Sequence, residues 1–334
     1  MRLTHRLHQY IEGMWWLEKR PPLWLRGLSY IYQRCSESDQ QKRLKKVTEP
    51  PLPLISIGNI TVGGSGKTPF VAWLAKVLLK QGLQPVILCR GDGGKQIKSV
   101  LLTHSSKAND VGDEAVLLKQ LTNCPVIAGK DRIHGARMAK HHGNVIILDD
   151  GFQYRQLHRS CDIVLIPSEG IGNGYLIPAG PLREPASALQ RADIIIRSGD
   201  IGFMPLGSGK EWHWQARNAN LHDWMHCSVE LPSDGIAITA IARPQRFIQS
   251  LQSQHIKLHE SYIFPDHHTF SQSDIRPILS QKRPIMTTAK DAVKLREIWP
   301  KHVPLWVLEQ QAYAEKGLLN MILKCLPVGN QDTE

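Results

Sequence analysis

The stretch over residues 55–68, Ile-Ser-Ile-Gly-Asn-Ile-Thr-Val-Gly-Gly-Ser-Gly-Lys-Thr, constrains the fold of this chain more than any other. An apolar run over 53–57 predicts a buried strand, and an apolar periodic segment over 70–79 predicts a helix. A glycine-rich turn that ends in Gly-Lys-Thr lies between them. Strand, turn and helix in this order form the P-loop pattern, which cradles phosphate groups.

The residue types of this turn suit a phosphate chain. Glycines let successive backbone N–H groups curl around phosphate oxygens, and the start of the helix adds partial positive charge. Lys67 is expected to reach the β- and γ-phosphates of ATP, and Thr68 to offer its hydroxyl to Mg²⁺. The strict pattern has glycine where Thr61 stands, so a plain glycine-rich turn is the alternative. The expected nucleotide-binding residues are Thr61, Val62, Gly63, Gly64, Ser65, Gly66, Lys67 and Thr68.

Downstream of the P-loop, apolar runs and amphipathic segments alternate. This alternation predicts an α/β fold with a mostly parallel sheet and helices on both faces. Ligands of such sheets bind at the carboxyl ends of the strands. The P-loop, the turn at Arg90 and Asp149-Asp150 all follow predicted strands, so they are expected to share one edge. The predicted strands are 85–88, 125–128, 145–148, 162–166 and 193–197, and the predicted helices 112–121 and 131–141.

A connector rich in glycine and proline is predicted over 198–216, and a second α/β unit follows it. The length of 334 residues suggests roughly two domains. We therefore expect two α/β domains with mostly parallel sheets, over 48–205 and 206–334. The first is a P-loop NTPase-like domain, and an N-terminal amphipathic helical segment over 1–47 precedes it. The second unit has predicted strands at 235–240, 256–263, 284–287 and 303–308 and helices at 244–253, 271–280 and 315–325.

Acidic residues at two strand or helix ends are candidates for metal binding. Asp149-Asp150 follows a fully apolar strand, as in a Walker B element, and Mg²⁺ prefers such hard oxygen ligands. The alternative is an ordinary Asp-Gly turn. Asp113 and Glu114 lie in the first turn of a predicted helix, where acids often only complement the helix dipole.

Two further segments have candidate polar residues. Residues 170–185 hold four glycines and three prolines, so they predict a long irregular loop, and such loops are usually functional. Arg183 near its end suits a phosphate clamp, although a structural Ω-loop is the alternative. Asp266-His267-His268 follows a predicted strand and resembles an acid/base or metal site, with an ordinary turn as the alternative.

The N-terminus combines basic and aromatic residues. Residues 1–34 hold six Lys or Arg, two Glu and six Trp or Tyr, and two amphipathic helices separated by Pro21-Pro22 are predicted there. Neither is long enough to span a bilayer, but both suit the headgroup region of an anionic membrane. A hairpin that packs on its own domain is the alternative. Residues 40–46 are interpreted as a basic linker, and the six scattered cysteines as reduced core residues of a cytosolic protein.

Together these motifs carry a family resemblance. Ile57-Gly-Asn-Ile-Thr-Val-Gly-Gly-Ser-Gly-Lys-Thr-Pro69, Asp149-Asp-Gly-Phe-Gln153, Pro178-Ala-Gly-Pro-Leu-Arg-Glu-Pro185 and Phe264-Pro-Asp-His-His268 stand in the order found in tetraacyldisaccharide 4′-kinases. Gly112-Asp-Glu-Ala115, Gly172-Asn-Gly174, Ile241-Ala-Arg-Pro244 and Thr288-Ala-Lys-Asp-Ala-Val-Lys-Leu295 also match that order. The chain therefore resembles this family from its N-terminal segment to about residue 325.

The resemblance implies a function. Members transfer the γ-phosphate of ATP, with Mg²⁺, to the 4′-hydroxyl of a tetraacylated glucosamine disaccharide 1-phosphate, giving lipid IVA for lipid A synthesis. They are peripheral proteins at the cytoplasmic face of the bacterial inner membrane. The resemblance implies that Asp113 is the catalytic base, supported by His267, with Lys67 at the phosphates. It implies Thr68, Glu114 and Asp149 as metal ligands, and Arg90, Asp150, Asn173, Arg183 and Glu184 as acceptor residues.

The chain departs from the family pattern at two positions. Asp92 stands where the family usually has tyrosine, and Tyr154 where it usually has histidine. Both departures concern acceptor contacts, and neither changes the expected catalytic residues.

Two other classes of P-loop protein are alternatives. A GTP-dependent switch would need an Asn-Lys-x-Asp base reader, but Lys290 and Asp291 are adjacent, so that motif is absent. A nucleic-acid-stimulated ATPase would fit the net charge of +11 and the sequence pI of about 9.4. Such a protein has basic stripes with stacking aromatics along its core, whereas here that cluster is N-terminal. No nucleic-acid partner is therefore expected.

Overall fold

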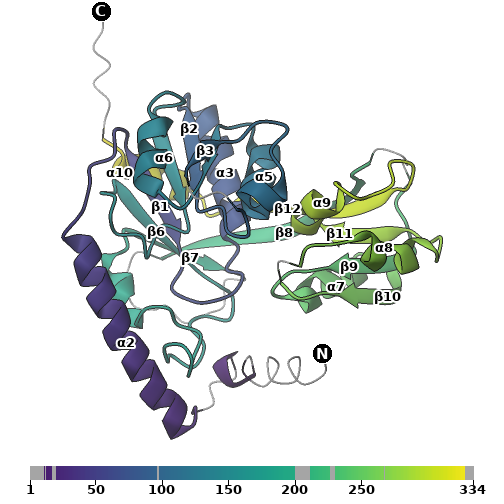
Figure 1. Cartoon of the computed structure of the whole chain (residues 1–334), viewed down its shortest axis with the longest axis horizontal. Helices are drawn as coiled ribbons and strands as arrows, with labels where there is room; N and C mark the ends of the chain where they lie inside the picture. The colour runs from purple at the N-terminus through teal and green to yellow at the C-terminus, as the bar shows by residue number, and fades with distance from the viewer. Residues whose placement is uncertain are drawn as a thin grey trace, which may run out of the picture.

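The computed structural model describes residues 11, 13–16, 20–95, 98–199, 211–225, 230–266 and 268–327. Its centre is one twelve-stranded sheet in the order β10-β9-β11-β12-β8-β7-β6-β1-β5-β2-β4-β3. Most neighbouring strands run parallel; β8 with β12 and β3 with β4 are antiparallel. Figure 1 shows two lobes, each an α/β unit, that the long strands β8 and β12 connect. The expected fold class is confirmed.

The first lobe contains the P-loop. Its central strands are buried along their whole length, as expected for parallel strands covered on both faces. Helices α3, α5 and α10 cover one face, and α6 covers the other. Its strands are β1 Leu54–Gly58, β2 Pro85–Cys89, β3 Val100–Leu101, β4 Val126–Ala128, β5 Val145–Asp149, β6 Cys161–Ile166 and β7 Ile194–Ser198. Its helices are α3 Lys67–Lys80, α4 Ala108–Val111, α5 Asp113–Thr122, α6 Arg132–Ala139, the 3₁₀ helix η1 Ala186–Arg191 and the returning α10 Leu318–Cys325.

The second lobe is smaller and packs helices on both faces of its own parallel strands. One core cluster lies under α8 and α9, and another lies under α7. Its strands are β9 Asp234–Thr239, β10 Lys257–Ile263 and β11 Ile285–Thr288. Its helices are α7 Pro244–Ser253, α8 Gln272–Leu279 and α9 Ala289–Leu295.

Strands β8, Glu211–Asp223, and β12, Leu305–Ala314, make the sheet continuous. The first residues of β8 pair with β7 of the first lobe, from Ile195 opposite Glu211 to Ser198 opposite Trp214. The rest of β8 pairs along β12, and β12 pairs with β11 of the second lobe. The predicted connector is therefore wrong over 211–216, because these residues form a strand. Strand β8 forms because its backbone hydrogen-bonds with β7 and β12, and this pairing cannot be read from the local composition.

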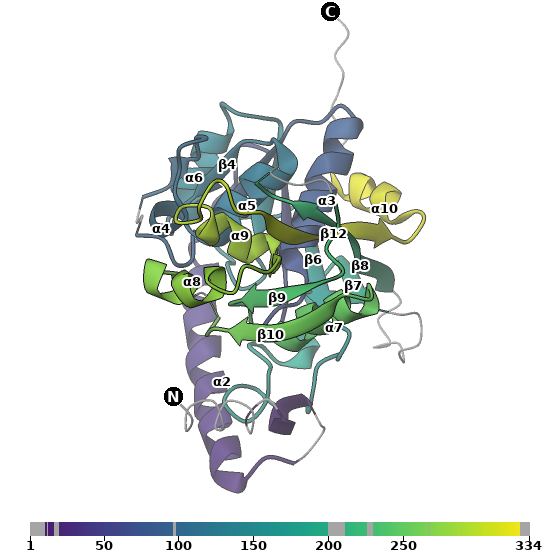
Figure 2. The same cartoon turned by 90° about the vertical axis from the view of Figure 1, so that its right-hand side faces the viewer.

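Helix α2, Leu23–Leu44, lies along one side of the molecule, as Figures 1 and 2 show. The predicted break at Pro21-Pro22 is present, since the helix begins after Pro22. The predicted linker over 40–46 is wrong over 40–44, because α2 continues to Leu44 and a turn follows it. Its Gln, Lys, Arg and Leu residues are good helix formers, and neither Gly nor Pro interrupts them. Residues 1–10 of the other predicted helix lie outside the described residues.

The cysteines are only partly core residues. Cys89, Cys124 and Cys161 are buried free thiols, as expected. Cys35 is instead exposed on α2, because the polar C-terminal part of that helix reaches beyond the apolar core.

Candidate active site

The carboxyl ends of β1, β2 and β5 lie at one edge of the sheet, as the sequence predicted. These strands are neighbours in the order β1-β5-β2, and Ile57 of β1 lies opposite Asp149 of β5. The P-loop follows β1, Arg90 follows β2, and Asp150 follows Asp149. The fold thus gathers the expected phosphate, metal and acceptor residues around one edge.

The P-loop leads into α3, which begins at Lys67. Gly66 immediately before it is left-handed, with φ of 78°, and no side chain caps the helix. The N–H groups of the first turn are therefore available to an anion. Asn59 Nδ2 donates to Ser65 Oγ at 3.1 Å, a buried hydrogen bond that connects the start of the loop to its end. A β-carbon on Gly66 would lie 3.2 Å from the ring of Trp214, so β8 supports the loop from the side.

Lys67 and Asp150 form an ion pair at the mouth of the P-loop. Lys67 Nζ lies 3.0 Å from Asp150 Oδ1, and Arg183 Nη1 lies 3.3 Å from Asp150 Oδ2. Burial would raise the pKa of Asp150, but Lys67 and Arg183 hold it well below its usual range. Arg132 Nη1 also donates to the backbone carbonyl of Asp150 at 3.0 Å. Asp150 is thus an ionised partner for Lys67 that phosphate oxygens can replace.

Asp149 is the buried carboxylate beside this pair. Burial and the nearby Glu114 raise its pKa to about 7, although Lys67 opposes them. Its Oδ1 is buried and has no hydrogen-bond partner among the described residues. A cation would satisfy that oxygen, so the donor set of Asp149, Glu114 and the Thr68 hydroxyl fits Mg²⁺. The described residues contain no group of three His, Cys, Asp or Glu that could hold a metal ion by themselves.

Asp113 and Glu114 begin α5, and lysines of the second lobe face them. Asp113 is buried, and its Oδ1 accepts a hydrogen bond from the N–H of Glu114 at 2.9 Å. Lys290 Nζ lies 3.1 Å from Glu114 Oε1, and Lys294 Nζ lies 3.9 Å from Asp113 Oδ2. Burial lowers the pKa of Lys290, but Glu114 and Asp113 outweigh it and raise the pKa. These lysines were not among the predicted site residues, because they reach the acids of α5 only through packing of the second lobe against the first.

His267 lies outside the described residues, but its turn can be placed. Lys294 Nζ donates to the backbone carbonyl of His268 at 3.1 Å, so one ammonium contacts both this turn and Asp113. The side chain of His268 pairs with Asp274, 3.2 Å away, and stacks on Phe264. The structure therefore brings the turn of the second lobe to the start of α5.

The loop over 170–185 runs beside the first residues of the P-loop. The N–H of Val62 donates to the carbonyl of Pro181 at 2.8 Å, and the N–H of Arg183 donates to that of Ile60 at 2.7 Å. Asn173 donates within the loop to the carbonyl of Ala179 at 3.0 Å, so its amide holds the loop together.

The other two predicted acceptor residues have partners of their own. Arg90 is exposed and pairs with Asp92 at 3.3 Å. Glu184 is buried and binds Arg191 through both oxygens, at 2.7 and 2.9 Å.

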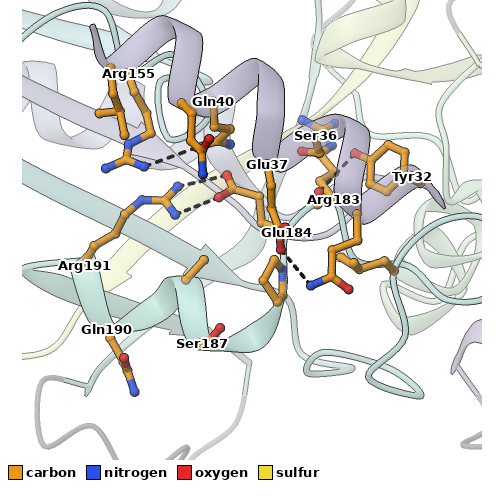
Figure 3. A pocket seen from close by; sticks show the side chains of 16 residues that line it. Tyr32, Ser36, Glu37, Gln40, Arg155, Arg183, Glu184, Ser187, Gln190 and Arg191 are labelled. Atoms are coloured by element: carbon orange, nitrogen blue, oxygen red, sulfur yellow. Dashed lines mark hydrogen bonds and ion pairs between the residues drawn. The ribbon is translucent and has the colours of Figure 1, made fainter. Parts of the chain in front are cut away.

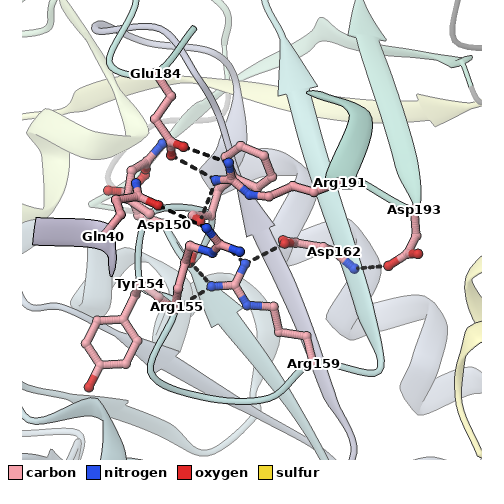
Figure 4. A network of polar contacts seen from close by, with 12 residues as sticks. Gln40, Asp150, Tyr154, Arg155, Arg159, Asp162, Glu184, Arg191 and Asp193 are labelled. Atoms are coloured by element: carbon pink, nitrogen blue, oxygen red, sulfur yellow. Dashed lines mark hydrogen bonds and ion pairs between the residues drawn. The ribbon is translucent and has the colours of Figure 1, made fainter. Parts of the chain in front are cut away.

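Arginines hold the backbone that follows Asp149, a feature that sequence reasoning missed. Figure 4 shows Arg159 and Arg191 beside this loop. Arg159 Nη2 donates to the carbonyl of Gly151 at 3.0 Å, and Arg191 Nη2 donates to that of Phe152 at 3.2 Å. Asp150 itself has a positive φ of 51°. The arginines thus fix an unusual backbone conformation that aims the Asp150 side chain at Lys67.

A groove of about 330 Å³ separates α2 from the body of the first lobe. Figure 3 shows that its wall includes Tyr32 of α2, Arg155, and Arg183 with Glu184 from the loop. The Tyr32 hydroxyl donates to the carbonyl of Arg183 at 3.0 Å. Two of the predicted acceptor residues therefore line this groove.

Comparison with known proteins identifies the family. The family model described as Tetraacyldisaccharide-1-P 4′-kinase matches residues 22–327. A tetraacyldisaccharide 4′-kinase of Methylobacillus flagellatus is 36% identical over 325 residues, covering 92% of this chain and 91% of that protein. One from Halorhodospira halophila is 38% identical over 266 residues, covering 77% of this chain and 78% of its own.

A solved structure agrees with these sequence matches. The crystal structure of LpxK from Aquifex aeolicus in complex with ATP superposes with a TM-score of 0.76. It is 29% identical and covers 91% of this chain and 98% of that one. This chain belongs to the tetraacyldisaccharide 4′-kinase family.

Proposed function

We propose that this chain transfers the γ-phosphate of ATP to the 4′-hydroxyl of a tetraacylated glucosamine disaccharide 1-phosphate, giving lipid IVA. The observation that carries the proposal is the convergence of Lys67 of the P-loop, the buried carboxylate of Asp149 and the acids of α5 at one sheet edge. Relatives named for this activity support the choice of acceptor. The chain is therefore an ATP-dependent kinase of lipid A biosynthesis.

The chemistry divides among named residues. The turn over 61–66 and Lys67 hold the phosphates, and Lys67 exchanges Asp150 for phosphate oxygens. Asp149, Glu114 and Thr68 would hold Mg²⁺, which supplies charge neutralisation when bound. Asp113 orients the acceptor hydroxyl and takes its proton as the oxygen bonds to the γ-phosphorus and ADP leaves. His267 of the second lobe supports Asp113 in this role.

Acceptor binding belongs to the loop beside the P-loop. Arg183 contacts Asp150 next to Lys67 and also lines the groove under α2, so it connects the reacting edge to that groove. Glu184, which is bound to Arg191, also lines the groove under α2. Asn173 shapes the loop, and Arg90 lies at the neighbouring turn. This arrangement suits an acceptor that carries both sugar hydroxyls and acyl chains.

The membrane side of the protein is assigned to α2. Trp24 and Ile31 are 67% and 59% exposed, and Leu23, Leu28 and Tyr30 are exposed as well. No helix among the described residues is long and apolar enough to cross a bilayer. We therefore place the protein at the cytoplasmic face of the inner membrane, with α2 lying in the anionic headgroup region.

The two lobes have separate tasks in this proposal. The first lobe, residues 48–205 together with α10, binds ATP, and the second lobe, which holds β9–β11 and α7–α9, closes the cleft and delivers the His267 turn. Closure would exclude water from the γ-phosphate, which otherwise competes with the acceptor.

One assay tests the reaction. Purified protein is incubated with γ-labelled ATP, Mg²⁺ and the disaccharide 1-phosphate lipid in detergent micelles. The label is expected in a lipid product that carries a second phosphate, and only when both substrates are present. Label appearing as free phosphate alone, with or without nucleic acid, would assign the chain to the ATPases instead.

A further inference from the structure

Arg243 of the second lobe lies against the P-loop. A β-carbon built on Gly63 would be 3.8 Å from Arg243 Nη2. Gly63 follows Val62, whose N–H donates to the carbonyl of Pro181 in the loop over 170–185. Gly63 therefore lies on the side of the P-loop that faces this loop, to which acceptor binding is assigned. The second lobe therefore places a guanidinium beside the turn that is proposed to hold the phosphates.

The guanidinium is fixed from two other directions. Its Nη1 pairs with Glu169 Oε2 at 2.6 Å, and its face covers the ring of Trp16, 4.7 Å from the ring centroid. The side chain is only 17% exposed. Burial would raise the pKa of Glu169, but Arg243 and Arg246 lower it, so the carboxylate stays ionised and holds the arginine. One edge of the guanidinium is thus anchored while Nη2 faces the P-loop.

We propose that Arg243 is a further catalytic residue, which contacts the γ-phosphoryl group during transfer and neutralises its charge. Phosphoryl transfer spreads negative charge over three oxygens, and a planar cation with several donors matches that distribution. An arginine supplied from outside the P-loop contributes about 10³–10⁵ in turnover in enzymes that use one. Because Arg243 comes from the second lobe, its contact would also couple catalysis to the position of that lobe. This inference rests on the proposed kinase function.

Arg246 provides a matched control. It lies in the first turn of α7, for which Arg243 is the N-cap residue, and pairs with the same Glu169 carboxylate, but it is 48% exposed. The Arg246→Ala variant therefore removes one positive charge from the same cluster but leaves the Arg243 guanidinium beside Gly63.

The experiment compares the wild-type enzyme with Arg243→Ala, Arg243→Lys and Arg246→Ala, using ATP, Mg²⁺ and the lipid acceptor in micelles. Arg243→Ala is expected to lower kcat about 10³-fold with KM values within threefold of the wild type. Arg243→Lys keeps a cation beside Glu169 and is expected to lose at least tenfold, because it lacks the planar fork. Arg246→Ala is expected to keep kcat within twofold. Added ethylguanidinium ion is expected to restore part of the activity of Arg243→Ala.

A second measurement separates catalysis from folding. Wild type and Arg246→Ala are expected to trap ADP with aluminium fluoride as a transition-state mimic, whereas Arg243→Ala binds ATP but does not trap the mimic. Wild-type kcat in Arg243→Ala would overturn the inference. So would an equal loss in Arg246→Ala, or a rise in acceptor KM at unchanged kcat, which would make Arg243 a binder of the acceptor phosphate. An inactive wild type would instead refute the proposed function, and the inference with it.

Discussion

At the scale of single residues, the site is held together by ion pairs that its ligands replace. Lys67 is only 14% exposed and binds Asp150, while Asp149 lies buried beside them. In the proposed mechanism, the phosphates of ATP take the place of Asp150 at Lys67, and Mg²⁺ becomes the partner of Asp149. The free site is thus organised around charges that are complementary to MgATP.

Lys67→Ala is expected to lower kcat by at least 10²-fold while the fold stays intact. Turnover is expected to fall because Lys67 binds the phosphates in the proposed mechanism. The fold is expected to stay intact because Asp150 still has Arg183 as an ion-pair partner. Turnover and thermal unfolding would be measured together, with Lys76→Ala on the exposed side of α3 as the control. Near wild-type turnover in Lys67→Ala would remove the P-loop from the mechanism.

Gly66→Ala is expected to weaken ATP binding at least tenfold. Its φ of 78° disfavours any side chain, and the new β-carbon would press on Trp214, 3.2 Å away. Gly82→Ala is the control, because Gly82 has φ of 80° and open space around it. Both variants should lose about 1 kcal/mol of unfolding free energy. Equal ATP affinity in the two variants, by calorimetry, would show that β8 does not position the loop.

At the scale of elements, local chemistry determined what the sequence could predict. Helix α7 begins at Pro244 and ends at Ser253, as predicted, because proline favours the first helical position and an apolar stripe follows. The phosphate turn and the acids after β5 were equally readable. Strand β8 was not, since its pairing with β12 depends on residues far along the chain. Lys290, Lys294 and Arg243 reach the site only through packing of the lobes, so no local pattern assigns them.

Helix α2 presents different faces to the protein and to its surroundings. Ser29 Oγ donates to the carbonyl of Leu176 at 2.7 Å and accepts from the N–H of Ala179 at 3.0 Å, so this side is docked. Among the apolar residues of α2, Leu25 and Tyr32 are half-buried, whereas Leu28 and Ile31 are exposed. The exposed face is the part that a bilayer would cover.

Replacing Trp24, Leu28 and Ile31 with glutamine is expected to lower partitioning into anionic vesicles about 100-fold. Each large apolar side chain contributes up to about 1.5–3 kcal/mol when it leaves water, and glutamine keeps the helix. Vesicle sedimentation measures the change, and Leu79→Gln, at an exposed leucine of α3, is the control. Activity on acceptor in micelles should be retained. Unchanged sedimentation would place the membrane contact elsewhere.

At the scale of the whole molecule, the two lobes meet at charged residues. Lys290 and Lys294 of α9 face Glu114 and Asp113 of α5, and the same Lys294 contacts the turn that contains His267. The continuous sheet through β8 and β12 limits how far this contact can open. Movement of the lobes therefore changes the surroundings of Asp113 and Glu114 directly.

Asp113→Ala and His267→Ala are each expected to lower kcat by about 10²–10⁴-fold, the usual contribution of a general base. The double variant should lose little more than the worse single variant, because residues that act as a unit are non-additive. ATP affinity should stay nearly constant in all three. Multiplicative losses in kcat would show that the two residues act independently, and normal turnover in His267→Ala would leave its turn a structural one.

Helix α10 makes the core of the first lobe depend on a segment that follows the second lobe in the sequence. Leu318 and Ile322 are fully buried in the same cluster as α3 and the central strands. During synthesis on the ribosome, that apolar surface stays exposed to water until α10 has emerged. The core of the first lobe is therefore incomplete until α10 has been synthesised, and such exposed apolar surface is prone to aggregation. A chain truncated after β12 would keep every residue of the phosphate site and still lack the helix that seals the hydrophobic core beneath it.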